Sequence, residues 1–198
     1  MKSKDTRIEI IESAQRIFSR SGRENVTMSD VAAESHRCLR TLYNYFLNID
    51  ELHLATIEYE LTKMLTTLTR IANQDLPADK KLEQFVIAHF RSVREATEHD
   101  HSLRHAFYTN HEEIERARRP IDYKEIRLIK EILNRGRIEG IFDIHDTNWT
   151  AMLILYAMKG IEPPYLKQSI GAYLDDHKDN IINMIFSFNT FNKTNWYC

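Results

Sequence analysis

Two short helical patterns lie almost end to end in the segment TMSDVAAESHRCLRTLYNYF, and no other feature of the chain constrains its fold as closely. Thr27 and Asp30 have the spacing of a capping box, in which the two side chains bond free backbone N–H groups at the start of a helix. We therefore expect one helix that begins at Thr27 and ends near Ser35 or His36. A second helix is expected over about 38–46, so that a tight corner joins the two.

The second of these helices has two chemically different faces. One face carries the apolar residues Leu39, Leu42 and Phe46, which are spaced to anchor the helix to a core. The other face carries polar residues at i, i+3, i+4 and i+7 with tyrosines at its edges: Arg37, Arg40, Thr41 and Asn44, flanked by Tyr43 and Tyr45. Arginine pairs with guanine and asparagine with adenine in the major groove, while hydroxyl groups bond bases or phosphates. The pattern predicts a helix that reads DNA, although a solvated surface helix has the same amphipathic spacing.

The rest of the chain has few residues that interrupt helices, since 198 residues include only 5 Gly and 4 Pro. No Asn-Gly or Asp-Gly turn separates alternating runs, so we expect an all-α fold. The apolar periodicity predicts further helices over about 6–21, 50–72, 78–97, 101–109, 111–136, 147–160 and 164–190. Gly22 is expected to end the first helix, Pro120 to kink or interrupt its helix, and the stretch 160–164 to separate the last two helices.

Charge is distributed unevenly along the chain, although the formal net charge is only −2. Residues 1–48 contain eight Lys or Arg and six Asp or Glu, so the basic excess lies in the part that contains the two short helices. Because this excess is small, we expect DNA affinity to rest on placed contacts from a dimer and to weaken as salt rises.

Three pieces of sequence, in this order and spacing, are typical of one family: VTMSDVA from Val26, TLYNYF from Thr41 and DEL from Asp50, all after a helix over 6–21. In these first fifty or so residues the chain resembles the tetracycline-repressor (TetR) family of bacterial transcriptional regulators. The resemblance implies a helix-turn-helix DNA-binding domain over 1–48 and a larger helical effector-binding and dimerisation domain over 49–198. The family motif assigns DNA contacts to Thr41, Tyr43, Asn44 and Tyr45. We add Arg37 and Arg40 from their helix face, and Thr27 at the start of the preceding helix.

The corner between the two short helices departs from the family pattern. The family has glycine, an aliphatic residue and Ser or Thr there, whereas this chain has His36, Arg37 and Cys38. Cysteine is a poor N-cap, and histidine tolerates a left-handed backbone better than most residues other than glycine. Lysines that commonly follow the second helix in the family are replaced by Leu47 and Ile49.

The resemblance also implies partners. Two apolar helices at the end of the chain are expected to form a homodimer, which would bind an inverted-repeat operator in double-stranded DNA. An internal pocket is expected to bind a small apolar or amphipathic effector. Candidate pocket residues combine apolar bodies with sparse polar tips: Phe85, His89, Phe107, Tyr108, Met152 and Tyr156. The resulting prediction is a ligand-responsive regulator, acting as a repressor. The alternative is a helical dimeric module that binds a ligand or a protein without recognising an operator.

Other function classes have weaker support in the sequence. Nucleophile motifs, glycine-rich phosphate loops and paired Cys-x-x-Cys motifs are absent, so we expect no enzyme activity and no cofactor. The run Glu98-His99-Asp100-His101, with His105, is the densest group of potential metal ligands, but its spacing fixes no complete ligand set, and no metal site is predicted. No signal peptide or membrane-spanning apolar run is present, which predicts a cytoplasmic protein.

Overall fold

Helices account for most of the computed structural model, which describes residues 2–99 and 111–166. No β-strand occurs in these two ranges, so the predicted all-α fold is confirmed. The described residues belong to two compact units, each of which is considered separately. Unit 1 comprises Met1–Lys63 and Arg94–Pro120, and unit 2 comprises Met64–Val93 and Ile121–Cys198. The predicted domain boundary between 48 and 49 stays a prediction.

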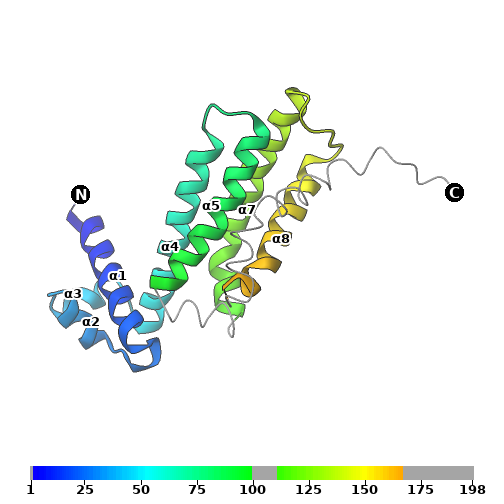
Figure 1. Ribbon diagram of the computed structural model, residues 1–198. Coiled ribbons are helices and arrows are strands. Elements are labelled where there is room, and N and C mark those ends of the chain that lie inside the picture. Colours follow the sequence, from blue (N-terminus) through cyan, green and yellow to red (C-terminus); the bar gives the residue numbers. More distant parts are fainter. Residues whose placement is uncertain (1, 100–110, 167–198) are drawn as a thin grey trace. The chain divides into compact units, whose positions relative to one another are not determined.

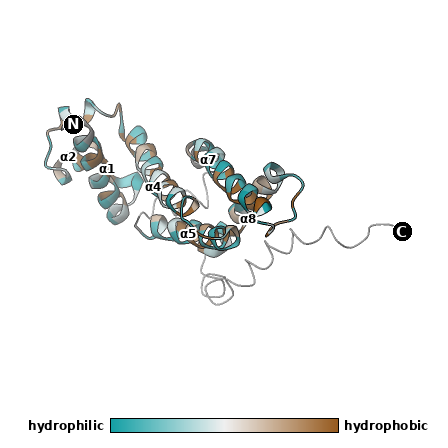
Figure 2. Ribbon diagram, turned by 90° about the horizontal axis from the view of Figure 1, so that it is seen from above, coloured by the Kyte–Doolittle hydropathy of each residue, from teal (hydrophilic) through white to brown (hydrophobic). Residues whose placement is uncertain are grey.

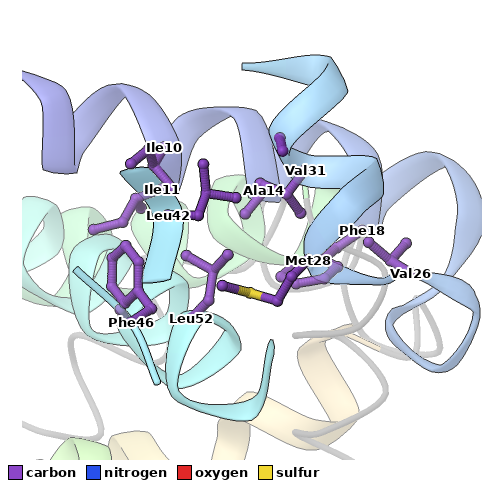
Figure 3. Close-up of a cluster of buried hydrophobic side chains, with 12 residues drawn as sticks. Ile10, Ile11, Ala14, Phe18, Val26, Met28, Val31, Leu42, Phe46 and Leu52 are labelled. Carbon is purple, nitrogen blue, oxygen red and sulfur yellow. The ribbon is translucent and has the colours of Figure 1, made fainter. Parts of the chain in front are cut away.

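Unit 1 begins with α1 (Lys2–Ser21), a 3-10 turn η1 (Arg23–Asn25), α2 (Met28–Glu34) and α3 (Leu39–Tyr43), followed by the first part of α4 (Ile49–Ala72) (Figure 1). Apolar side chains from α1, α2, α3 and α4 converge in one core (Figure 3). The members of this core are Ile10, Ile11, Ala14, Phe18, Val26, Met28, Val31, Ala32, Leu42, Phe46, Leu52 and Ala55.

Local signals place the ends of α1 and α2. Gly22 ends α1 with φ 78°, and its N–H donates to the Phe18 carbonyl at 2.9 Å. At the start of α2, the Thr27 N–H donates to Asp30 Oδ2 at 2.9 Å, while the Asp30 N–H donates to Thr27 Oγ1 at 3.3 Å. The predicted capping box is therefore confirmed.

The C-terminus of α2 explains the unusual corner. His36 has φ 52° and lies in the left-handed region, which glycine normally occupies at this position. The His36 N–H donates to the Ala33 carbonyl at 3.2 Å, and the Arg37 N–H donates to the Ala32 carbonyl at 3.0 Å. These two bonds form a complete Schellman motif, so the tight corner persists with histidine in place of glycine.

Helix α3 is shorter than the predicted 38–46 and ends at Tyr43. The Leu42 carbonyl accepts from the N–H groups of both Tyr45 and Phe46 at 2.9 Å, so the chain tightens into a 3-10-type turn after Tyr43, and Phe46 lies in the core as predicted. Leu39, which was expected to be an anchor, is 38% exposed because it lies in the first turn of a helix only five residues long.

Unit 2 contains the rest of α4, the residues of α5 (Ala78–His99) up to Val93, the residues of α7 (His111–Ile138) from Ile121, and α8 (Thr147–Leu166). Hydrophobic and hydrophilic residues are interspersed along these helices (Figure 2). The largest fully buried side chains here are Leu68, Leu82, Phe85, Ile129 and Leu133. The turn after Ala72 and Pro77 before α5 lie where a break was predicted.

One predicted break is wrong in the described residues, and another is wrong in part. Helix α7 is not interrupted at Pro120, because Pro120 and Arg116 are both exposed and water can bond the carbonyl that lacks its N–H donor, whereas the predicted kink stays a prediction. Helix α8 continues through Gly160 to Leu166 instead of ending at 160, and Glu162, Tyr165 and Leu166 beyond Gly160 are buried. The helices expected over 101–109 and beyond 166 lie outside the described residues.

Candidate functional site

The candidate nucleic-acid interface is the exposed side of α3 in unit 1. Leu42 and Phe46 are fully buried in the core and fix the orientation of the helix (Figure 3). On its other side Arg40 and Asn44 are exposed and Thr41 is half-buried. The structure thus brings three of the predicted DNA-binding residues to one face, with their side chains directed away from the core.

The other predicted DNA-binding residues lie around this face in different settings. Tyr43 is about half exposed, whereas Tyr45 is half-buried and packs against the core of unit 1. Thr27 is exposed, but its hydroxyl is occupied in the capping box of α2. A tyrosine with an exposed edge and a buried body suits a phosphate contact, since the core holds the ring in place.

Arg37 differs from Arg40 in having a partner within the protein. It forms an ion pair with Glu9 of α1, and both side chains are largely exposed. An exposed pair contributes roughly 0–1 kcal/mol, so phosphate or base can displace Glu9 at small cost. Sequence patterns carry no signal for this pair, because Glu9 and Arg37 are 28 residues apart.

Most arginines of the first 48 residues are occupied within unit 1. Arg16 and Arg20 both pair with Glu34, Arg23 pairs with Asp50, and the guanidinium of Arg7 lies 5.1 Å from the centre of the Phe46 ring. Among the described residues, Arg40 forms no ion pair. Most of these arginines therefore already contact partners within unit 1, and Arg40 is the cation most directly presented on α3.

Cys38 occupies the N-cap position of α3 but makes no capping bond to the backbone. Its Sγ lies 3.0 Å from Thr41 Oγ1, so the thiol and hydroxyl share a hydrogen bond. The hydrogen bond with the Thr41 hydroxyl is the main cause that lowers the pKa of the exposed Cys38 thiol, and the nearby backbone N–H of Thr41 adds to it. This hydrogen bond orients the Thr41 side chain. It was not predicted, although Cys38 and Thr41 have the spacing of a capping pair.

The predicted effector-binding residues are distributed differently. Phe85 and His89 are fully buried on α5 of unit 2, and Met152 is half-buried on α8. Tyr156 is 57% exposed and lies on the surface of the chain. Phe107 and Tyr108 lie outside the described residues, as do His101 and His105 of the histidine-rich run.

His89 is the centre of a buried polar triad that the sequence analysis missed. Its Nδ1 lies 2.9 Å from Glu125 Oε2 on α7, and its Nε2 lies 2.8 Å from Glu162 Oε1 on α8. Burial lowers the pKa of the His89 ring, but attraction to Glu125 and hydrogen bonds to both carboxylates outweigh it and raise the pKa to about 9. The ring is therefore an imidazolium at neutral pH and donates from both nitrogens.

A sequence signal for the two glutamates did exist. Glu125 lies four residues from Ile121 and from Ile129, and Glu162 lies four residues from Met158 and from Leu166, so each glutamate interrupts an apolar stripe. A carboxylate at such a position is buried when the helix packs, and burial requires a partner. Which partner it finds depends on residues far away in the chain.

The described residues define an all-helical protein with a helix-turn-helix motif near its N-terminus. None of the described helices is long and apolar enough to cross a membrane. Within the described ranges, no group of three or more His, Cys, Asp or Glu side chains is arranged to hold a metal ion.

Comparison with known proteins identifies this fold. No protein-family model matches the chain, and no curated protein sequence matches it. A putative TetR-family transcriptional regulator from Mesorhizobium loti has a TM-score of 0.73 at 16% identity, covering 95% of this chain and 98% of that chain. A TetR/AcrR-family regulator from Thermobifida fusca has a TM-score of 0.68 at 17% identity, covering 96% and 100%.

The regulator FadR from Bacillus subtilis, solved in complex with stearoyl-CoA, has a TM-score of 0.69 at 15% identity, covering 90% of this chain and 96% of that chain. At such identities the comparisons establish the fold. The chain has the fold of TetR-family transcriptional regulators, as its first fifty residues predicted.

Proposed function

We propose that this chain is a ligand-responsive transcriptional regulator, a repressor, that binds an inverted-repeat operator as a homodimer. The observation that carries the proposal is the anchored α3, which presents Arg40, Thr41 and Asn44 while Leu42 and Phe46 are buried beneath it. A short helix held by its neighbours and exposed along a polar face is the geometry that major-groove reading requires.

The chemistry of this face supports base recognition more than general attraction to phosphate. Arg40 suits guanine O6 and N7, and Asn44 suits adenine N6 and N7. Since most nearby arginines pair with carboxylates of unit 1, few positive charges remain for non-specific binding. We therefore expect a shallow salt dependence per protomer and a large share of affinity from α3.

An exposed apolar stripe on α8 supports the dimer. Trp149, Leu153 and Tyr156 are spaced i, i+4 and i+7, and their side chains are 58%, 50% and 57% exposed. Three large apolar side chains on one helix face of a protomer are typical of a protein–protein interface. We propose that this face of α8, together with the segment that follows it, pairs with the same face of a second copy.

A small apolar or amphipathic effector is proposed to act through unit 2, where the predicted residues Phe85 and His89 are fully buried and Met152 is half-buried. Such a molecule can release DNA only if it binds more tightly to the form of the dimer that does not fit the operator. Its binding and operator binding must then weaken each other by the same factor.

The test is selection of genomic fragments by the purified full-length chain, followed by affinity measurements with variants. We expect recovery of an inverted repeat, and Asn44→Ala is expected to weaken binding to it by about five- to a hundredfold, the loss of one bidentate base contact. Thr41→Ala and Tyr45→Phe are expected to weaken it as well. Asn73→Ala is the matched control, because Asn73 is an exposed asparagine in the turn after α4. Unchanged affinity of the Asn44 variant would refute the residue assignment.

The second candidate function is a helical dimer that binds a ligand or a protein but recognises no operator. The ion pair between Arg37 and Glu9 favours this alternative, because it occupies a predicted DNA-binding arginine. Leu47 favours it as well: its side chain is 80% exposed, in a stretch where the family commonly has lysines that contact phosphate. Binding that depends on salt but shows no preference among genomic fragments would support this alternative.

A further inference from the structure

Glu9 lies beside a residue of the candidate nucleic-acid interface, although it belongs to a different helix. It is exposed on α1, next to Ile10 and Ile11, which are buried in the core of unit 1. Its carboxylate pairs with the guanidinium of Arg37 in the corner before α3. The Glu9 side chain is 53% exposed and that of Arg37 is 40% exposed, so a third charged group can reach the pair from solvent.

The backbone on both sides of this pair is fixed by contacts within unit 1. The Arg37 N–H donates to the Ala32 carbonyl at 3.0 Å, as part of the Schellman motif that closes the corner. The two buried isoleucines hold the adjoining turn of α1 against the core. An exposed ion pair is weak, so the Arg37 side chain can exchange Glu9 for another anion without a change of fold.

The partner of Glu9 distinguishes it from neighbouring carboxylates. Glu34 and Asp30 stabilise α2, Glu34 through ion pairs with two arginines of α1 and Asp30 through the capping box. Glu9 instead neutralises an arginine that is predicted to bind DNA. Arg40, the other arginine predicted to do so, forms no ion pair among the described residues. The two arginines of the interface therefore present different charge to DNA.

A DNA phosphate and the Glu9 carboxylate compete for the same guanidinium. Phosphate can bond Arg37 only by replacing the carboxylate, and the displaced carboxylate then stays close to a polyanion that repels it. On an operator, base contacts from α3 hold the DNA in one register and keep a phosphate beside Arg37, which offsets the cost of the exchange. On DNA of another sequence the register is not fixed, and Glu9 retains Arg37.

From these observations we propose that Glu9 is a specificity-determining residue. By competing with backbone phosphate for Arg37, it lowers the affinity for non-operator DNA more than the affinity for the operator. This inference rests on the proposed function, since it assigns a residue that tunes the same interface. It gives a function to a carboxylate of α1, outside the two short helices.

Affinities of the full-length wild-type chain and of Glu9→Gln test the proposal. Fluorescence anisotropy measures binding to the selected operator duplex and to a scrambled duplex of equal length and composition, at several salt concentrations. We expect Glu9→Gln to bind the scrambled duplex about three- to thirtyfold more tightly as a dimer, because each protomer loses one weak competitor. The salt slope on that duplex should steepen by up to about 0.9 per protomer, the effect of one further phosphate contact.

Operator affinity should rise by a smaller factor, so the ratio of operator to scrambled affinity should fall. A ratio that is unchanged or larger in Glu9→Gln would overturn the proposal. Weaker operator binding by this variant would overturn it as well, because Glu9 would then orient Arg37 toward DNA instead of competing for it.

Two further variants show whether Glu9 acts through Arg37. Glu24→Gln is the matched control, because it removes the same charge at an exposed position of η1, where the carboxylate accepts from Asn25 at 3.3 Å. It should leave the affinity ratio unchanged. In an Arg37→Gln background, Glu9→Gln should have no effect beyond that of Glu24→Gln. An effect that persists without Arg37 would overturn the assignment. Circular dichroism establishes that each variant is folded.

These measurements separate the inference from the proposed function. If the chain selects an operator but Glu9→Gln behaves like Glu24→Gln, the inference fails and the regulator stands. If the chain shows no sequence preference but Glu9→Gln tightens DNA binding through Arg37, the competition stands and operator recognition fails. If it binds neither duplex, both fail.

Discussion

Replacing His89 by glutamine is expected to remove a pH dependence of stability that the wild-type protein shows between about pH 6.5 and pH 9. The pKa of the folded-state ring is raised from 6.5 to about 9, so the folded protein retains a proton in this window that the unfolded chain releases. Stabilisation from the imidazolium is therefore complete below about pH 6.5 and is lost as the pH rises through about 9.

The magnitude follows from the size of the pKa difference. Each unit corresponds to about 1.4 kcal/mol, so a rise from 6.5 to about 9 contributes about 3 kcal/mol to the free energy of unfolding. Within the window that free energy falls by up to about 1.4 kcal/mol per pH unit, because the two states differ by one bound proton. The carboxylates responsible are Glu125 on α7 and Glu162 on α8.

Urea denaturation followed by circular dichroism at about pH 6, 7, 8 and 9 measures this slope. Subtracting the His89→Gln curve from the wild-type curve isolates the contribution of the triad, and His145→Gln is the control at an exposed histidine. If His89→Gln does not fold, proton NMR of the wild-type chain provides the same test, since one of the nine histidine rings must titrate near pH 9. Equal slopes in wild type and variant, or no ring that titrates above about pH 8, would refute the reasoning.

Three further predictions test other parts of the structure. His36→Gly should raise the free energy of unfolding by up to about 1 kcal/mol in urea titrations, because histidine occupies a left-handed conformation there; a decrease would contradict this. Phe18→Ala should lower it by about 3–5 kcal/mol, since the ring is fully buried, and a loss under about 1 kcal/mol would argue against the core of unit 1. Leu153→Lys should give folded monomers in analytical ultracentrifugation, and an unchanged dimer would exclude this face of α8.

The N-terminal motif was predictable because its determinants are local. Thr27 and Asp30 are three residues apart, and the bonds that close the corner at His36 lie within α2 and the two residues after it. Rules for capping and backbone conformation use information of this range. The early end of α3 was not predicted, because no glycine or proline follows Tyr43 to mark the end of the helix.

The triad and the length of α8 depend on contacts between distant residues. His89 bonds partners 36 and 73 residues away, a separation over which periodicity carries no information. The same burial of Glu162 favours continuation of α8 through Gly160 and the two prolines, which local rules treat as a break. Tertiary packing overrode local propensity at both places.

Operator spacing provides the most direct test of the central proposal, which is that two copies of α3 read one face of DNA together. The half-sites of the selected inverted repeat are moved apart by about five base pairs, half a helical turn, and binding is measured by fluorescence anisotropy at constant salt. We expect affinity to fall to that of a scrambled sequence, with partial recovery when about ten base pairs are inserted instead. Affinity that does not depend on the spacing would contradict the proposed dimeric regulator.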